Sequence, residues 1–156
     1  MKLITTEIEK AENQITETLE AVKDFGMQTI IIYPNSDAGG RKIIRKIRKY
    51  ENPPFIMSYK NLPQKDYFSL LKHTSVLVGN SSSGIIESPS FKLPVVNIGI
   101  RQEGRERANN VINVNHDRKE ILKAMKKALS EEFKRELRNC VSPYGDGKTA
   151  QRITTV

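Results

Sequence analysis

The stretch that most constrains the fold spans residues 75–107, SVLVGNSSSGIIESPSFKLPVVNIGIRQEGRER. It contains two short apolar runs typical of buried strands, at 76–78 and 95–98. A loop of small residues at 79–84 and a short helix lie between them, and a basic loop follows. A strand, a small polar loop and a helix N-terminus often bind phosphate, because backbone N–H groups and the positive end of the helix dipole point to one place. The stretch therefore predicts an anion site.

Helix and strand patterns alternate through the rest of the chain. Apolar spacing predicts a helix at 5–24, capped by Thr5 or Thr6 and ended by Gly26. Further helices are expected at 41–50, 64–73, 117–128 and 130–139, and the segment 142–153 reads as a loop and the start of another helix. Strands are expected at 27–34, 55–59 and 110–114, the first of them buried on both faces. This order is typical of an α/β fold, a parallel sheet with helices on both faces.

Two polar turns follow strands of this predicted sheet, at 35–40 and 79–84. Ligands of such sheets bind outside the carboxyl ends of the strands, so the two turns are expected to line one shared pocket.

The residue types in that pocket favour a nucleotide. The hydroxyl and N–H groups of Ser81, Ser82 and Ser83 suit a phosphate, and Glu87, expected in the first turns of the helix, suits the paired hydroxyls of a ribose. Arginines of the following basic loop could reach an anionic ligand: Arg101, Arg105 and Arg107. The alternative is that none of these residues binds a ligand. The serine loop would then only cap the helix, Glu87 would only complement the helix dipole, and the arginines would be solvated.

Composition narrows the class of protein. The 156 residues are expected to form one domain, and no apolar run reaches the roughly 18 residues that span a bilayer. The N-terminus shows no export signal, the lone Cys140 is expected to be an inert structural thiol, and no Cys/His cluster has metal-binding spacing. These features predict a cytoplasmic protein without metal.

The net charge of +8 concentrates on predicted helix faces at 41–49 and 123–138. Charges at helical spacing usually form a solvated face, and no aromatic residues are interleaved with them. We therefore expect neither a nucleic-acid nor a membrane partner.

The run VGNSSSGIIESPSFKLPVVNIGIRQEGRERANNVI resembles the signature of the hydrolysing UDP-N-acetylglucosamine 2-epimerases, and YPNSDAGG and SPYGDGKTAQRI resemble two flanking motifs of that family. The likeness extends from about Ile4 to the C-terminus. It implies that residues 1–156 form a single Rossmann-like UDP-binding domain. This domain corresponds to the C-terminal half of a two-domain fold of the glycosyltransferase-B type.

The resemblance also implies roles for single residues. Ser81 and Ser82 would bind the UDP phosphates, and Glu87 the ribose hydroxyls. The UDP pocket would be completed from three other loops by Asn35, Leu62 and Arg101. The implied reaction hydrolyses UDP-GlcNAc with inversion at C2, through elimination of UDP to a 2-acetamidoglucal and its hydration. The products are N-acetylmannosamine and UDP. Relatives in the family accept a UDP-diacetamido-trideoxyhexose in place of UDP-GlcNAc. Both reactions serve sialic-acid-type sugar synthesis, and the resemblance implies no cofactor.

One departure from the family pattern bears on activity. The resemblance implies that the acid/base carboxylates belong to an N-terminal domain outside these 156 residues, and the family's His-Pro pair before the Thr-Thr-Glu segment is not matched by the residues before Thr5. His73 and His116 are expected to be structural or solvated, so no catalytic residue is assigned. We expect the isolated chain to be inactive and to bind UDP weakly. The missing domain is its expected partner, the face that domain would cover should be partly apolar, and a homo-oligomer remains open.

Two other functions remain open at this point. The first is the C-terminal domain of a UDP-sugar glycosyltransferase, which the RQEGRER loop disfavours. The second is a stand-alone module that binds a sugar nucleotide.

Overall fold

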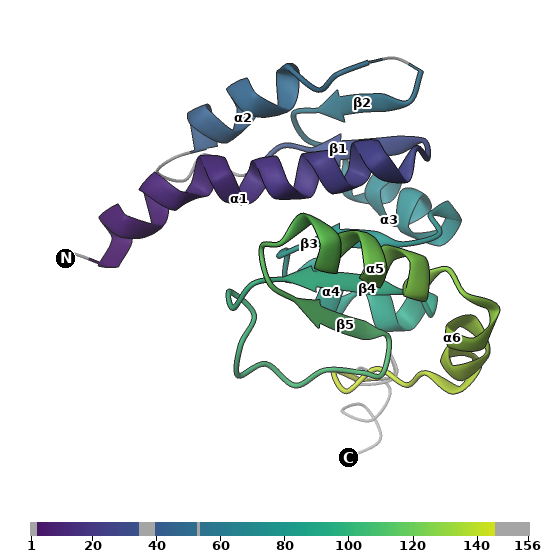
Figure 1. Cartoon of the computed structure of the whole chain (residues 1–156). Coiled ribbons are helices and arrows are strands. Elements are labelled where there is room, and N and C mark those ends of the chain that lie inside the picture. Colours follow the sequence, from purple (N-terminus) through teal and green to yellow (C-terminus); the bar gives the residue numbers. More distant parts are fainter. Residues whose placement is uncertain (1–2, 35–39, 53, 146–156) are drawn as a thin grey trace. The chain divides into compact units, whose positions relative to one another are not determined.

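The computed structural model describes residues 3–34, 40–52 and 54–145, with side chains from residue 11 onward. These residues divide into two compact units. Unit 1 contains residues up to 67 together with 116–122, and unit 2 contains 68–115 together with the residues from 123 onward. Figure 1 labels the helices and strands of both units.

Unit 1 is built on two helices and a two-stranded parallel sheet. Its elements are α1 (Leu3–Phe25), β1 (Thr29–Ile32), α2 (Gly40–Arg48) and β2 (Ile56–Tyr59). Strands β1 and β2 pair in register from Thr29 opposite Ile56 to Ile32 opposite Tyr59. The buried hydrophobic side chains that the structure describes in unit 1 are all aliphatic: Leu19, Ala21, Val22, Ile47, Ile56 and Ile121.

The long N-terminal helix confirms the helical periodicity but corrects its start. Helix α1 begins at Leu3, so Thr5 and Thr6 lie inside the helix and the predicted cap is wrong. At the other end, Gly26 adopts φ +70° and its N–H donates to the carbonyl of Val22 at 3.3 Å. A residue in this left-handed conformation ends a helix readily when it is glycine, so the predicted end is confirmed.

The expectation that the first strand is buried on both faces is wrong. Ile30 of β1 is 38% exposed, and its neighbours Thr29 and Ile31 are half-buried. Two strands make a surface too narrow to be covered on both faces within one small unit.

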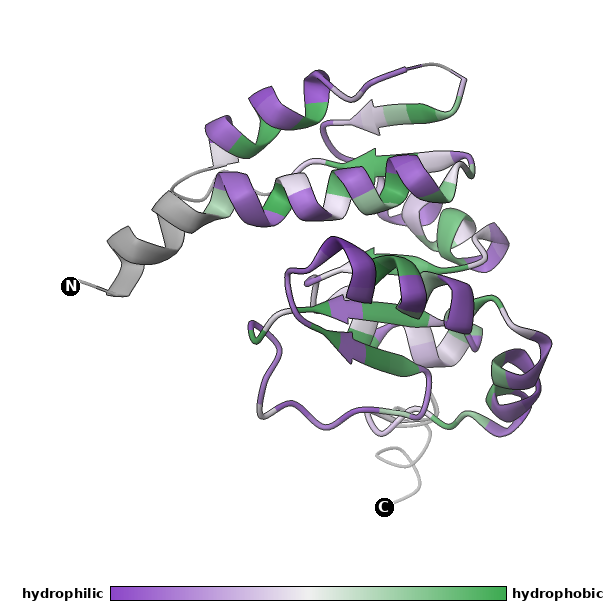
Figure 2. Ribbon diagram, viewed as in Figure 1, coloured by the Kyte–Doolittle hydropathy of each residue, from purple (hydrophilic) through white to green (hydrophobic). Residues whose placement is uncertain are grey.

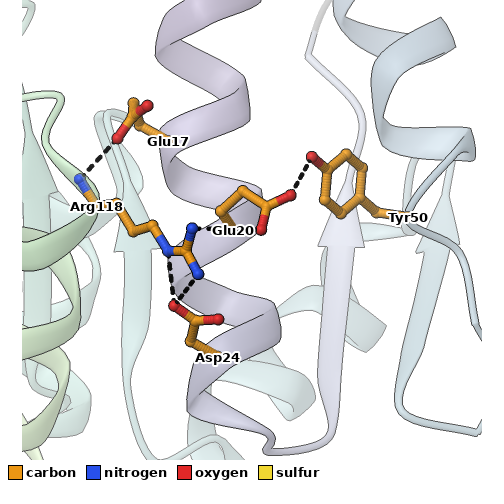
Figure 3. A network of polar contacts seen from close by, with 5 residues as sticks. All are labelled: Glu17, Glu20, Asp24, Tyr50 and Arg118. Atoms are coloured by element: carbon orange, nitrogen blue, oxygen red, sulfur yellow. Dashed lines mark hydrogen bonds and ion pairs between the residues drawn. The ribbon is translucent and has the colours of Figure 1, made fainter.

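A polar network stabilises unit 1 around the first turn of α5 (Arg118–Ala128) (Figure 3). The guanidinium of Arg118 lies 2.6 Å from Asp24 and 3.7 Å from Glu20, and its backbone N–H donates to Glu17 at 3.0 Å. The Tyr50 hydroxyl donates to Glu20 at 2.6 Å. That hydrogen bond, followed by burial, raises the pKa of Tyr50 to about 12. The α1 carboxylates thus fix both Arg118 and Tyr50.

Unit 2 contains a three-stranded parallel sheet in the order β3–β4–β5. The strands are β3 (Leu77–Gly79), β4 (Val95–Ile98) and β5 (Val111–Val114). Strand β4 is central and buried at all four positions, as predicted for 95–98, whereas β3 is only half-buried and begins one residue later than expected. Figure 1 shows α4 (Ser83–Ile86) behind this sheet and α5 in front of it.

Helix α3 (Gln64–His73), which both units share, has its predicted bounds. The helix predicted at 130–139 is divided into α6 (Glu131–Glu136) and the 3-10 helix η2 (Leu137–Asn139). The 3-10 helix η1 (Ser88–Phe91), which follows α4, was not predicted as a separate element. The side-chain oxygen of Ser130 caps α6 by accepting from the N–H of Phe133 at 3.2 Å.

Each unit therefore contains one parallel sheet flanked by helices, which confirms the predicted α/β class. Periodicity identifies strands but does not determine which strands become neighbours. Figure 2 shows hydrophobic residues along β4 and hydrophilic ones over the outer faces of α2 and α5, so the basic helix faces are solvated as predicted. Within the described residues, no helix has the length and apolar character to cross a bilayer.

Candidate functional site

The serine loop, defined here as residues 80–82, joins β3 to α4 in unit 2. Gly79 ends β3 with φ +145°, a conformation that side-chain-bearing residues rarely adopt, so glycine is needed at this turn. The loop is shorter than the six residues expected, because Gly79 belongs to the strand and Ser83 already begins the helix.

The two serines assigned to phosphate binding are both exposed. Ser82 is the N-cap residue of α4, but its side chain makes no capping hydrogen bond. The hydroxyl of Ser81 accepts from the N–H of Ser83 at 3.3 Å. The capping alternative therefore accounts for Ser81 and not for Ser82, whose hydroxyl can meet a ligand.

Helix α4 has a single turn, which limits what its dipole contributes. Backbone N–H groups near its start are already hydrogen-bonded: those of Gly84 and Ile85 donate to the carbonyls of Ser81 and Ser82 at 3.1 and 2.9 Å. Anion binding at this loop would therefore depend on side-chain hydroxyls and nearby cations more than on a helix dipole.

Glu87 lies one residue beyond α4, where the sequence reading placed it inside the helix. It forms the C-cap of α4 and the N-cap of η1, without a side-chain capping bond to η1. A carboxylate at a helix C-terminus opposes the dipole of that helix, so the dipole-complement alternative does not hold for α4. The Oε2 atom of Glu87 is buried and has no hydrogen-bond partner among the described residues. Such an atom calls for a donor, and two adjacent hydroxyls would supply one.

The arginine loop, defined here as residues 99–107, follows β4. Two tight turns shape it: the N–H of Glu103 donates to the carbonyl of Ile100 at 2.8 Å, and Gly104 adopts φ +77°. Arg101 and Arg105 are exposed, which leaves both guanidinium groups able to meet an anion. Arg107 is half-buried and donates from Nη2 to the carbonyl of Gln102 at 2.7 Å, so it stabilises the loop itself.

Gln102 joins the two loops and was not singled out from the sequence. The residue is only 4% exposed, and its Nε2 donates to the carbonyl of Asn80 at 2.8 Å. The one available signal was an uncharged amide between arginines in a loop otherwise suited to solvent. The bond places the arginine loop beside the serine loop, so Ser81, Ser82, Glu87 and Arg101 come from one region of unit 2.

The other two predicted UDP contacts are Leu62 and Asn35. Leu62 is half-buried in the segment between β2 and α3 and belongs to unit 1. Asn35 lies outside the described residues, as does most of the turn at 35–40, so the shared pocket stays a prediction. The end of the flanking motif at 142–153 also lies outside them.

The remaining reactive side chains fit structural roles. Cys140 is buried, and this burial raises the pKa of its thiol, as expected for an inert cysteine. The Nδ1 atom of the exposed His73 lies 2.8 Å from the carbonyl of Ser69, one turn earlier in α3. Burial lowers the pKa of His116, which favours its neutral form. In the part of the chain that the structure describes, no group of three or more His, Cys, Asp or Glu residues could hold a metal ion.

Comparison with known proteins identifies the family. The sequence profile of the family described as UDP-N-acetylglucosamine 2-epimerase matches residues 4–156. The UDP-N,N'-diacetylbacillosamine 2-epimerase (hydrolyzing) of Legionella pneumophila is 39% identical over 149 residues, which cover 96% of this chain and 38% of that protein. The polysialic acid biosynthesis protein P7 of Escherichia coli is 35% identical over 147 residues, which cover 90% of this chain and 36% of that protein.

A solved structure supports the fold. The UDP-GlcNAc 2-epimerase of Methanocaldococcus jannaschii, solved in complex with UDP-GlcNAc and UDP, superimposes with a TM-score of 0.68 at 20% sequence identity. The match covers 94% of this chain and 40% of that one. The chain thus spans two fifths or less of the length of these proteins. It belongs to the UDP-N-acetylglucosamine 2-epimerase family.

Proposed function

We propose that this chain is the UDP-binding part of a hydrolysing UDP-sugar 2-epimerase. The observation that carries the proposal is the Oε2 atom of Glu87, which is buried without a hydrogen-bond partner among the described residues and lies one residue beyond α4. A ribose presents two adjacent hydroxyls, and a carboxylate can accept from both. Hydrogen bonds to an ionised acceptor are about twice as strong as neutral ones.

The diphosphate of UDP would bind at the serine loop. The hydroxyl of Ser82 is exposed and makes no capping bond, and Ser81 is exposed beside it. Arg101, in the loop that Gln102 holds to Asn80, would neutralise part of the phosphate charge. Leu62 and Asn35 would complete the pocket from other loops, as the family resemblance implies.

In the proposed reaction this site binds the leaving group. A base removes the proton at C2 of the sugar while the C1–O bond breaks, and the electron pair of that bond goes to the UDP oxygen. Water then adds across the resulting double bond, with its hydroxyl on C1 and a proton on C2. The cations and donors of the site would stabilise the charge that develops on UDP.

The base and acid of this reaction belong, in our proposal, to a further domain outside these 156 residues. Neither histidine of the chain bonds to the serine loop among the described contacts, and partial burial lowers the pKa of the half-buried His116. Ile100, next to Arg101, is 72% exposed, which fits a rim that another domain would cover.

The part of the substrate that this chain would bind is the UDP moiety. UDP-GlcNAc and the UDP-diacetamido sugar named for the Legionella relative have it in common, so this site would bind both. The polysialic acid pathway named for the Escherichia coli relative supports a place in sialic-acid-type sugar synthesis.

Calorimetry of the 156-residue chain with UDP tests the proposal. We expect one UDP per chain, binding about tenfold or more weaker in Ser82→Ala, because a hydrogen bond to a charged group is worth about 1.5–3 kcal/mol. Ser75→Ala is the matched control, since Ser75 is exposed just before β3, and it should bind like the unmodified chain. A folded chain that binds no UDP at millimolar concentration would overturn the proposal. Turnover of either UDP-sugar by this chain alone would contradict the proposal that the catalytic base lies outside these 156 residues.

A further inference from the structure

We propose that Gln102 is a positioning residue that clamps the arginine loop onto the serine loop and so sets the phosphate-binding geometry. The clamp itself follows from the contacts of unit 2, whereas its effect on a diphosphate rests on the proposed function.

Three hydrogen bonds converge on Gln102. Its side-chain Nε2 donates to the carbonyl of Asn80 at 2.8 Å, across 22 positions of the sequence. Its backbone carbonyl accepts from Nη2 of Arg107 at 2.7 Å and from the N–H of Arg105 at 3.4 Å. One residue therefore ties together the start of the serine loop and both sides of the turn at Gly104.

The chemistry at this position requires an amide of this length. A carbonyl acceptor needs a donor, so the NH₂ group of Gln102 must face Asn80. The side chain is more than nine-tenths buried, and its Oε1 is buried without a partner among the described residues. A buried polar group in that state costs stability, so the glutamine is not explained by packing alone.

The consequence for the site is a fixed relation between two charge-binding elements. Arg101 precedes Gln102 directly, and Ser81 follows Asn80 directly. The bond between Gln102 and Asn80 therefore sets the distance between the guanidinium and the serine hydroxyls that a diphosphate would bridge. Preorganised donors bind an anion better than donors on a loose loop, because less conformational entropy is lost on binding.

The first experiment needs no ligand. Gln102→Met preserves the length and apolar body of the side chain and removes the buried Oε1. It breaks only the hydrogen bond to Asn80. Because Asn80 is exposed, its carbonyl can accept from water in the variant. We expect the unfolding midpoint to change little and the backbone amides of residues 80–82 and 100–107 to exchange hydrogen about fivefold or more faster. Gln28→Met, at an exposed glutamine of unit 1, should leave these rates unchanged. Unchanged exchange in Gln102→Met would overturn the clamp.

The second experiment asks for rescue by a conservative change. In Gln102→Glu the protonated carboxyl can donate to Asn80 and the ionised one cannot. After correction for intrinsic exchange, loop protection should return as pH falls through the pKa of that carboxyl. A residue that only fills space would show no such profile, so a flat profile would contradict the proposal. This variant also serves if Gln102→Met fails to fold.

The third experiment separates the phosphates from the rest of the ligand. UDP and uridine are titrated into the unmodified chain and Gln102→Met, with binding followed by NMR. Loss of the clamp should weaken UDP about fivefold or more and leave uridine unchanged, because uridine has no phosphate to position. Equal weakening of both would overturn the positioning role. If the unmodified chain binds neither, the proposed function fails, while the exchange measurements still decide whether the clamp exists.

Discussion

Gly84, within the NSSSG run, gives the sharpest test of how α4 is seated. A Cβ built at this residue would lie 3.0 Å from Cγ1 of Val95 and 3.6 Å from Cδ2 of Leu77. Val95 is a β-branched residue of the central strand and is only 2% exposed, so it has little freedom to move away. We therefore expect Gly84→Ala to press α4 away from the sheet.

The magnitude follows from two opposing terms. Overpacking of a dense core costs about 1–3 kcal/mol. Alanine is worth up to about 1 kcal/mol more than glycine inside a helix. The net expectation is a loss of about 1 kcal/mol, which lowers the melting temperature of a chain this size by about 2–4 °C. Because α4 begins at Ser83, its displacement should also weaken UDP binding.

Urea unfolding of four proteins measures this cost: the unmodified chain, Gly84→Ala, Val95→Ala and the double variant. Val95→Ala alone should destabilise through its cavity. In the double variant the new methyl group enters that cavity, so the coupling should be favourable by about 1 kcal/mol. A more stable Gly84→Ala with no coupling to Val95 would refute the close seating of α4 on β4.

Three further predictions concern other contacts. The pKa of Tyr50 in the folded chain, about 12, lies above its ordinary value of 10, so the stability from its bond to Glu20 is complete below pH 10 and is lost as pH rises through 12. Urea unfolding should show that loss, and Tyr50→Phe should lack it. Asn110→Ala should cost about 2–4 kcal/mol in the same assay, because it leaves the buried Ser88 hydroxyl and the Leu93 carbonyl without their shared donor. Equal stability of Asn110→Ala and the unmodified chain would contradict that assignment. The buried Cys140 thiol, with its raised pKa, should react with a thiol reagent many-fold more slowly in the folded chain than in urea, and equal rates would contradict its structural role.

Prolines and glycines at the ends of helices and strands made much of the fold predictable. Helix α3 and strand β4 have the bounds expected from sequence, and each is preceded by a proline, Pro63 or Pro94. Gly26 ends α1 as predicted because its left-handed conformation is a local preference. The start of α1 was missed because threonine caps helices but also occurs inside them, and sequence alone does not separate the two.

Contacts between residues far apart in the sequence were harder to predict. The strand order β3–β4–β5 in unit 2 depends on which strands become neighbours, and the apolar pattern does not encode this directly. Gln102 was missed for a related reason: its partner Asn80 is 22 positions away, and only the fold brings the two loops together. Glu87 was recognised by type and approximate place, but its position past the helix became clear only when α4 proved to be a single turn.

The central claim is that unit 2 binds UDP with its ribose on Glu87. Calorimetry with UDP and 2′-deoxy-UDP, on the unmodified chain and on Glu87→Ala, tests it most directly. We predict that removing the 2′ hydroxyl weakens binding to the unmodified chain about tenfold, since a hydrogen bond to a charged group is worth about 1.5–3 kcal/mol. The same change should have no effect on Glu87→Ala, which has lost the acceptor. An equal loss in both proteins would place the ribose elsewhere and contradict the account.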